Sequence, residues 1–115
     1  MLVIDTSFPA RDFNERNDEP VRQVVLHYTA EPFASSLHCL TRQGVSAHYL
    51  LPDPHDPSYR GAGYEELRAF RLVDEDKRAW HAGVSQWGGR DNLNSRSIGI
   101  EIVNQAWDDG EVLHF

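Results

Sequence analysis

Two apolar segments of this chain each carry one ionisable side chain among residues typical of a buried β-strand. Residues 24–29 have the sequence VVLHYT, and residues 97–102 have the sequence SIGIEI. Burying an imidazole or a carboxylate is costly unless the group has a polar partner. A fold that keeps His27 and Glu101 in such strands is therefore expected to place both at a polar or reactive site on a β-sheet.

The first segment presents its histidine near the end of a predicted strand. Alternation along the strand places Val25 and His27 on one face and Leu26 and Tyr28 on the other. A neutral imidazole is a good zinc ligand. A single strand histidine is, however, more often a hydrogen-bonded structural residue, and both interpretations of His27 stay open at this point.

The second segment places Glu101 on the opposite face from its isoleucines. It shares that face with Ser97 and Gly99. Because Gly99 has no side chain, we expect the surface beside Glu101 to be open to close approach by substrate or backbone. A carboxylate in this setting suits a general base acting on a zinc-bound water. The alternative is an ion pair with an arginine such as Arg96.

The remaining histidines give weaker signals. His81 follows Trp80 and precedes two small residues, which leaves room for a ligand; the alternative is a turn histidine beside a core tryptophan. His48 lies in a predicted strand and is a candidate for a buried hydrogen-bonding residue. The spacings of His27, His48 and His81 do not signal a zinc site made from these three.

Composition excludes several classes of protein. The chain has 115 residues, which indicates a single domain, and a net charge of −7, which argues against nucleic acid as a partner. No apolar run approaches the roughly 20 residues of a transmembrane segment. The single cysteine excludes an internal disulfide.

Periodicity and turn signals predict the order of the elements. We expect an N-terminal arm over 1–20, strands at 21–28, 45–51, 67–73 and 97–103, a helix at 31–42, loops at 52–63 and 84–95, and a turn at 108–110. The density of β-branched residues favours a central position for the strand at 21–28.

Five segments that follow one another along the chain carry a family resemblance. They are VVLHYTA at 24–30, SSL at 35–37, VSAHYL at 45–50, DKRAWHAGVS at 76–85 and residues 94–104. Together they resemble the type 2 zinc-dependent N-acetylmuramoyl-L-alanine amidases, a family that includes the peptidoglycan recognition proteins. The resemblance covers roughly residues 21–107 and is nearest to the muropeptide amidases. It implies an α/β fold with a mixed β-sheet flanked by helices.

The resemblance also implies roles for individual residues. His27 matches the first ligand of the zinc ion (Zn2+), and Glu101 matches the acidic residue that activates or positions the zinc-bound water. The segment with Trp80 and His81 matches part of the substrate groove. Further residues that fall near the groove by similarity are Tyr28, His48, Trp87, Arg90 and Asn94. The implied substrate is peptidoglycan or a released muropeptide, cleaved between N-acetylmuramic acid and L-alanine.

The sequence departs from the family pattern at its C-terminal side. The other zinc ligands, a histidine and an aspartate or cysteine, are expected beyond Phe115, as are a lysine near the last ligand and the helices that cover the sheet. The simplest interpretation is the N-terminal portion of a longer amidase. An apolar sheet face left uncovered would cause poor solubility or oligomerisation.

Three alternatives follow from that departure. The chain could be a non-catalytic peptidoglycan-binding module, an inactive truncated fragment, or an oligomer in which His114 of another copy completes a metal site. The resemblance implies the cell envelope or periplasm, with the cytoplasm as the alternative because no export signal is seen. The sequence specifies neither the oligomeric state nor the stem-peptide preference.

Overall fold

The computed structural model describes residues 2–81 and 93–104. It also describes the backbone of four two-residue strands at 86–87, 90–91, 107–108 and 111–112. Within these parts of the chain, no helix has the length and apolarity that crossing a bilayer requires.

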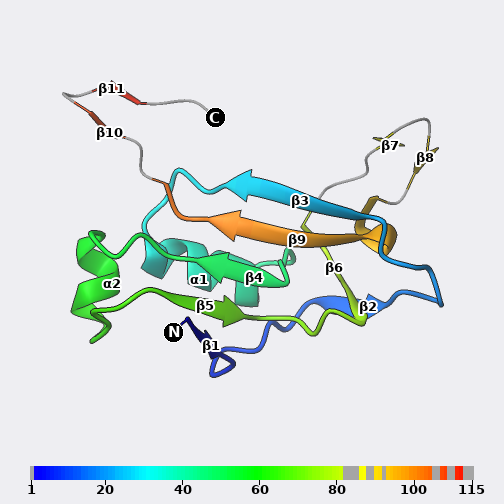
Figure 1. The fold of residues 1–115 in the computed structure, drawn as a ribbon, viewed down its shortest axis with the longest axis horizontal. Helices are drawn as coiled ribbons and strands as arrows, with labels where there is room; N and C mark the ends of the chain where they lie inside the picture. Colours follow the sequence, from blue (N-terminus) through cyan, green and yellow to red (C-terminus); the bar gives the residue numbers. More distant parts are fainter. Residues whose placement is uncertain are drawn as a thin grey trace.

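A five-stranded mixed β-sheet forms the centre of the fold (Figure 1). Its strands, in spatial order, are β1 (Val3–Asp5), β5 (Arg68–Arg71), β4 (Tyr49–Leu51), β9 (Ser97–Ile102) and β3 (Gln23–Tyr28). Strands β4, β9 and β3 run parallel to one another, β5 is antiparallel to β4, and β1 is parallel to β5. The two segments that carry His27 and Glu101 are therefore adjacent strands.

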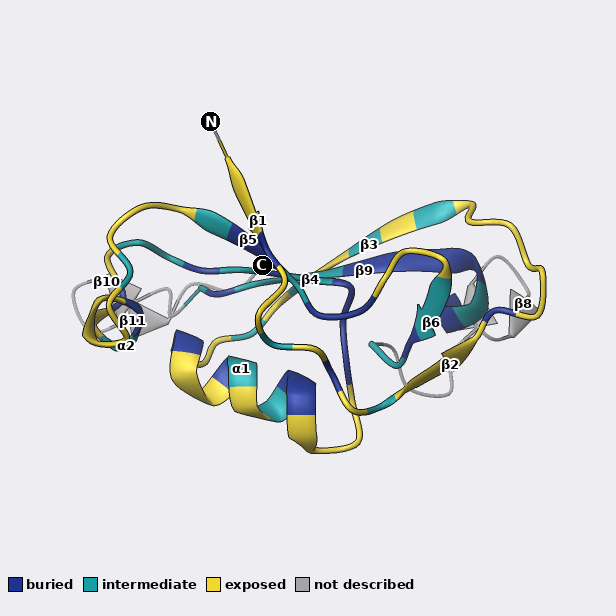
Figure 2. Cartoon of the chain, turned by 90° about the horizontal axis from the view of Figure 1, so that it is seen from below, coloured by how far each residue is buried: buried dark blue, intermediate teal, exposed yellow. Residues whose placement is uncertain are grey.

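One face of the sheet is covered by helix α1 (Phe33–Arg42), as Figure 2 shows. The helix presents Phe33 and Leu40 to the sheet, where they join Leu50 and Phe70 in the hydrophobic core. The short helix α2 (Pro57–Gly61) adds Tyr59, which is fully buried. Burial of these large side chains on one side of the sheet is the main stabilising contribution of this layer.

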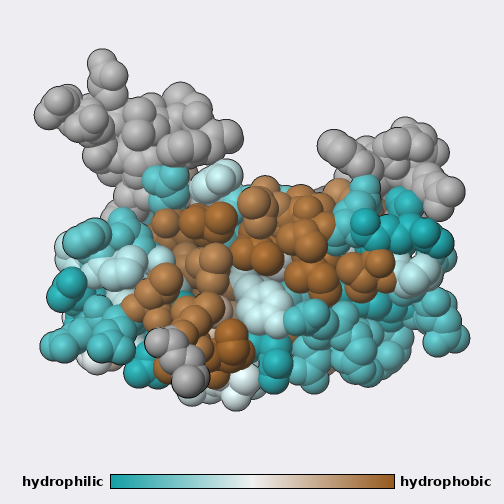
Figure 3. Space-filling model, in the orientation of Figure 1, coloured by the Kyte–Doolittle hydropathy of each residue, from teal (hydrophilic) through white to brown (hydrophobic). Residues whose placement is uncertain are grey.

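The opposite face of the sheet carries exposed apolar side chains. Val24 and Leu26 of β3 are 61% and 54% exposed, and Ile4 of β1 is 47% exposed. Ile100 and Ile102 of β9 lie beside β3 on the same face and are half-buried. Figure 3 shows apolar side chains gathered over these strands. We call Ile4, Val24, Leu26, Ile100 and Ile102 the apolar face.

Smaller elements surround the sheet. Strand β2 (Phe13–Glu15) pairs antiparallel with β6 (Lys77–Ala79), and a 3-10 helix, η1 (Leu93–Arg96), leads into β9. Two further antiparallel pairs are β7 (Gln86–Trp87) with β8 (Arg90–Asp91) and β10 (Trp107–Asp108) with β11 (Glu111–Val112).

The structure confirms the α/β class, the mixed sheet, the helix and the four main strands. Four expectations need correction. The N-terminal arm contains β1 and β2, the loop at 52–63 contains α2, and the loop at 84–95 contains β7, β8 and η1. Strand β3 lies at the edge of the five-stranded sheet, not at its centre. Part of the turn at 108–110 lies outside the described residues.

Candidate functional site

His27 and Glu101 lie directly opposite each other on neighbouring parallel strands. The register pairs His27 of β3 with Glu101 of β9, and Glu101 in turn with Leu50 of β4. Paired residues in a parallel ladder point to the same face, and Leu50 belongs to the core under α1. The imidazole and the carboxylate therefore share the helix-covered side of the sheet.

A cleft of about 460 Å³ opens between α1 and the ends of these strands. Glu101 and His81 contribute to its lining, together with Tyr28 at the end of β3. Helix α1 supplies the other wall through Ser35 and Cys39. A concave site with a few convergent polar groups is the usual form of a small-ligand site.

Glu101 is held in a partly desolvated setting. Burial raises the pKa of its carboxyl from 4.5 to about 7. The predicted alternative was an ion pair with an arginine such as Arg96, but no ion pair to Glu101 is found within residues 2–81 and 93–104. A carboxyl with a pKa close to neutral pH is suited to exchange protons with a reacting group.

His27 contacts a second histidine. Its Nε2 lies 3.0 Å from Nδ1 of His81. The other ring nitrogen of His81, Nε2, lies 2.8 Å from Oγ of Ser97. Burial, reinforced by the neighbouring His27 and His48, lowers the pKa of His81 to about 3, so its ring is neutral at pH 7. Burial also lowers the pKa of His27.

The imidazole ring of His81 fills the space above Gly99. A Cβ built on Gly99 would lie 2.3 Å from Cγ and 2.4 Å from Cδ2 of the His81 ring. We expected this space to be open to substrate or backbone, and the structure corrects that expectation. Glycine is needed here because the imidazole packs directly on the backbone of β9.

His48 is enclosed by the protein. It is 0% exposed, and its Nδ1 accepts a hydrogen bond from the Gly99 amide at 3.0 Å. Its Nε2 lies 2.8 Å from the Lys77 carbonyl oxygen and 3.0 Å from an Nη of Arg16. These contacts support the alternative that His48 is a buried hydrogen-bonding residue, and they place its ring away from the cleft.

The other predicted groove residues lie in different places. Tyr28 lines the cleft. Trp80 is half-buried, and its indole N–H donates to Asn14 on β2 at 3.0 Å instead of facing the cleft. Asn94 is buried in η1. The side chains of Trp87 and Arg90 lie outside the described residues.

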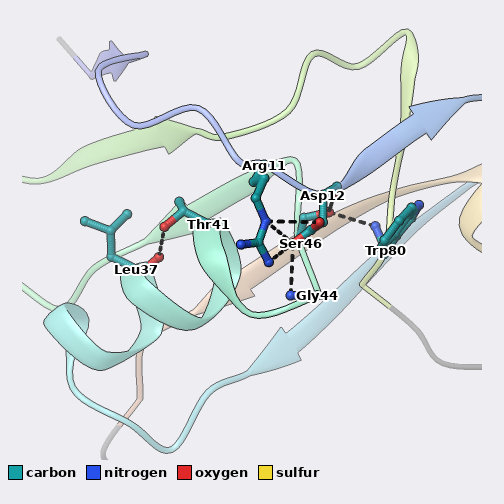
Figure 4. A network of polar contacts seen from close by, with 7 residues as sticks. All are labelled: Arg11, Asp12, Leu37, Thr41, Gly44, Ser46 and Trp80. Carbon is teal, nitrogen blue, oxygen red and sulfur yellow. Dashed lines mark hydrogen bonds and ion pairs between the residues drawn. The ribbon is translucent and has the colours of Figure 1, made fainter.

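Four contributors to the site were not identified from the sequence. Ser35, Cys39 and Gln43 form the α1 wall at spacings of four residues, so helical periodicity contained that signal. Ser46 holds the segment before His81: its amide donates to the Trp80 carbonyl at 3.1 Å, and its Oγ accepts from the Trp80 amide at 2.9 Å (Figure 4). The same Oγ donates to the Asp12 carbonyl at 2.5 Å.

The metal chemistry of the site is incomplete in the described residues. No group of three His, Cys, Asp or Glu side chains is placed to hold a metal ion within the part of the chain that the structure describes. His27 supplies an imidazole beside a carboxylate, which fits one zinc ligand, whereas a catalytic zinc takes three protein ligands and one open position.

Comparison with known proteins identifies related sequences. The sequence profile of a family described as N-acetylmuramoyl-L-alanine amidase matches residues 17–112. The AmpD protein of Escherichia coli, described as a 1,6-anhydro-N-acetylmuramyl-L-alanine amidase, is 70% identical over 102 residues. That alignment covers 89% of this chain and 48% of AmpD. The AmiD amidase of Escherichia coli is 47% identical over 87 residues, covering 76% of this chain and 30% of AmiD.

Solved structures share the fold. AmpDh3 of Pseudomonas aeruginosa, in complex with anhydromuramic pentapeptide, superposes with a TM-score of 0.72 at 64% identity, covering 77% of this chain and 35% of AmpDh3. AmiD of Escherichia coli, in complex with anhydro-N-acetylmuramic acid-L-Ala-D-gamma-Glu-L-Lys, superposes with a TM-score of 0.62 at 42% identity, covering 89% of this chain and 37% of AmiD. The chain spans about half the length of the AmpD relatives that it matches along most of its sequence.

Proposed function

The chain belongs to the N-acetylmuramoyl-L-alanine amidase family, and on this premise we propose that it takes part in hydrolysis of the amide between N-acetylmuramic acid and L-alanine. The observation that carries the proposal is the pairing of His27 with Glu101 across two parallel strands, where Glu101 lines the cleft. Muramyl peptides with the 1,6-anhydro sugar are the proposed substrates, because the names of the AmpD relatives specify that form.

Zinc is the proposed cofactor, with His27 as one of its ligands. The Nδ1 atom of His27 has no hydrogen-bond partner within the described residues, since the contact with His81 involves Nε2. We expect the other two ligands outside residues 2–81 and 93–104. When bound, zinc would polarise the scissile carbonyl and lower the pKa of a water ligand to about 7.

Glu101 is the proposed general base and acid. Its carboxylate would accept a proton from the attacking water, and the resulting carboxylic acid would donate a proton to the nitrogen of the leaving L-alanine. The raised pKa supports both steps, because the group is then close to half ionised at neutral pH. The α1 wall of the cleft would hold the stem peptide against the strand ends.

Product analysis by mass spectrometry tests the proposal. A 1,6-anhydro-muramyl tripeptide is incubated with the protein and zinc, and release of a stem peptide that begins with L-alanine is measured. Glu101→Gln is expected to lower the rate about 100-fold or more, and His27→Ala is expected to abolish it. Glu19→Gln, at an exposed residue outside the cleft, is the matched control and should leave the rate unchanged.

A peptidoglycan-binding module is the second candidate function. The cleft between α1 and the strand ends supports it, because such a cleft could hold a muramyl peptide without cleaving it. Retention of the muramyl peptide without release of the stem peptide would contradict the hydrolase and support binding.

His114, the proposed ligand from another copy, lies outside the described residues. An unchanged zinc stoichiometry in His114→Ala would exclude His114 as a zinc ligand. Location in the cell envelope or periplasm remains a proposal for fractionation to test.

A further inference from the structure

A chain of hydrogen bonds links His27 on β3 to the 3-10 helix before β9. His27 Nε2 contacts His81 Nδ1 at 3.0 Å, and His81 Nε2 contacts Ser97 Oγ at 2.8 Å. Ser97 Oγ contacts the carbonyl oxygen of Leu93 at 2.7 Å. This series of hydrogen bonds therefore ends on a backbone acceptor, the carbonyl oxygen of Leu93.

Because this series of hydrogen bonds ends on the Leu93 carbonyl oxygen, the position of each proton along the series can be assigned. A carbonyl oxygen only accepts, so the single hydroxyl proton of Ser97 is donated to Leu93. Ser97 Oγ then accepts from His81, which places a proton on His81 Nε2. A neutral ring with its proton on Nε2 has an acceptor at Nδ1, which is the atom that faces His27. His27 must donate from Nε2.

The ring of His81 is also fixed mechanically. It fills the space above Gly99, where a Cβ would come within 2.3 Å of its Cγ. The backbone of the preceding Trp80 is held at both its amide and its carbonyl by Ser46. Ser97, the anchor of the ring, is 0% exposed. A ring that is packed on Gly99, bonded to Ser97 and preceded by a fixed backbone can impose its own hydrogen-bond geometry on a neighbour.

From these contacts we propose that His81 is a positioning residue for His27. It holds the proton of His27 on Nε2 and leaves the Nδ1 lone pair as the atom that takes zinc. Metal-ligating histidines commonly donate their second ring N–H to an acceptor, which fixes the tautomer and the ring orientation. In this chain a neutral histidine serves as that acceptor. The assignment of the zinc atom rests on the proposed function, whereas the proton placement does not.

Nitrogen NMR of the metal-free protein tests the proton placement directly. The chemical shifts and couplings of the two His27 ring nitrogens report which of them is protonated. We expect the Nε2–H form in the parent protein and in His81→Gln, because a glutamine oxygen can accept from His27 while its amide donates to Ser97. His81→Phe, which has a ring without an acceptor, should yield a mixture of tautomers. Ser97→Ala should also yield a mixture, and Ser58→Ala is its matched control on α2.

Zinc affinity, measured by competition with a chelator, tests the consequence. His81→Phe is expected to bind zinc about 10- to 100-fold more weakly than the parent, and His81→Gln should recover most of the loss. An Nδ1–H tautomer in the parent, or a tautomer unchanged in both His81→Phe and Ser97→Ala, would overturn the positioning role. A parent that binds no zinc but shows the Nε2–H tautomer would instead overturn the zinc assignment and leave the positioning role supported.

Discussion

At the scale of single residues, the site depends on polar groups that are kept partly out of water on a sheet face. Glu101 has its pKa raised and His81 has its pKa lowered, and burial is the largest cause of both shifts. Each group is therefore held in its neutral form over a wider pH range than in water. The proposed roles use this neutrality in different ways, for proton exchange at Glu101 and for hydrogen-bond acceptance at His81.

Glu101 makes the stability of the metal-free protein depend on pH. The pKa of Glu101 is about 7 in the folded chain and 4.5 in the unfolded chain. Between these two pH values the folded chain therefore binds more protons than the unfolded chain. The contribution of this group to the free energy of unfolding must then fall as pH rises from 4.5 to 7. Urea unfolding in the presence of a chelator should show this fall as a difference between the parent and Glu101→Gln.

His81 provides the opposite slope, which is why the comparison with Glu101→Gln is needed. Its pKa is lowered from 6.5 to about 3, so its contribution to stability increases as pH rises through that range. The histidine is present in both proteins and cancels in the difference. A difference that is flat between pH 4.5 and 7 would contradict the burial of Glu101.

Adding a single methyl group at Gly99 should destabilise the protein. Gly99→Ala places a Cβ within 2.3 Å of the His81 ring and is expected to lower the free energy of unfolding by about 1–3 kcal/mol through overpacking. Gly61→Ala is the matched control, since no atom lies within 4 Å of the position that its new methyl group would take. Equal stabilities of the two variants in urea would show that the His81 ring moves aside freely.

At the scale of elements, the sequence predicted what periodicity encodes and missed what tertiary contacts create. The strand with His27 and the helix over 31–42 follow from patterns of local residues. Strands β1 and β2 have three residues each and exist through pairing with residues more than sixty positions away. The same holds for the site. Alternation predicted that Glu101 lies opposite the isoleucines of its own strand, but no local pattern showed that His81 would pack on Gly99.

Helix α2 is an element that local signals could have revealed. Asp56 precedes Pro57, which is a common N-cap and first-turn combination. The high proline and glycine content of 52–63 suggested a loop instead. The carboxylate of Asp56 also caps α1, because Oδ1 accepts from the Ser58 amide at 2.8 Å and Oδ2 from the Phe33 amide at 2.6 Å. The buried side chain of Asp56 thus caps the N-terminus of both helices.

Removing this shared cap should destabilise both helices together. Asp56→Ala is expected to lower the free energy of unfolding by about 2 kcal/mol, roughly one for each lost cap. Asp56→Asn keeps a single acceptor oxygen and should lose about half as much. Asp53→Ala removes one contact with the exposed His55 amide and is the control, with an expected change within about 0.5 kcal/mol. Equal losses for Asp56→Ala and Asp53→Ala in urea unfolding would contradict the shared cap.

At the scale of the whole molecule, the sheet has two unlike faces. Helix α1 lies on one side of the sheet (Figure 2), and this side holds the core and the cleft. The other side presents the apolar face defined above (Figure 3). Within the described residues no helix covers that face. Alternation in β3 contributes to both properties, because it directs His27 to the helix-covered side and Val24 and Leu26 to the solvent.

An exposed apolar surface of this kind should make the 115-residue chain self-associate. Val24→Lys combined with Leu26→Lys is expected to reduce self-association and binding of the dye ANS. In a contact between two copies through this face, the lysine charges of the copies would lie within one Debye length and repel each other. Both residues are more than half exposed, so the free energy of unfolding should change little. Sedimentation velocity measures the association directly. Val45→Lys, at a residue 40% exposed beside the cleft, is the control and should associate like the parent. If the double variant associates as strongly as the parent, contacts between copies must be made elsewhere than through β3.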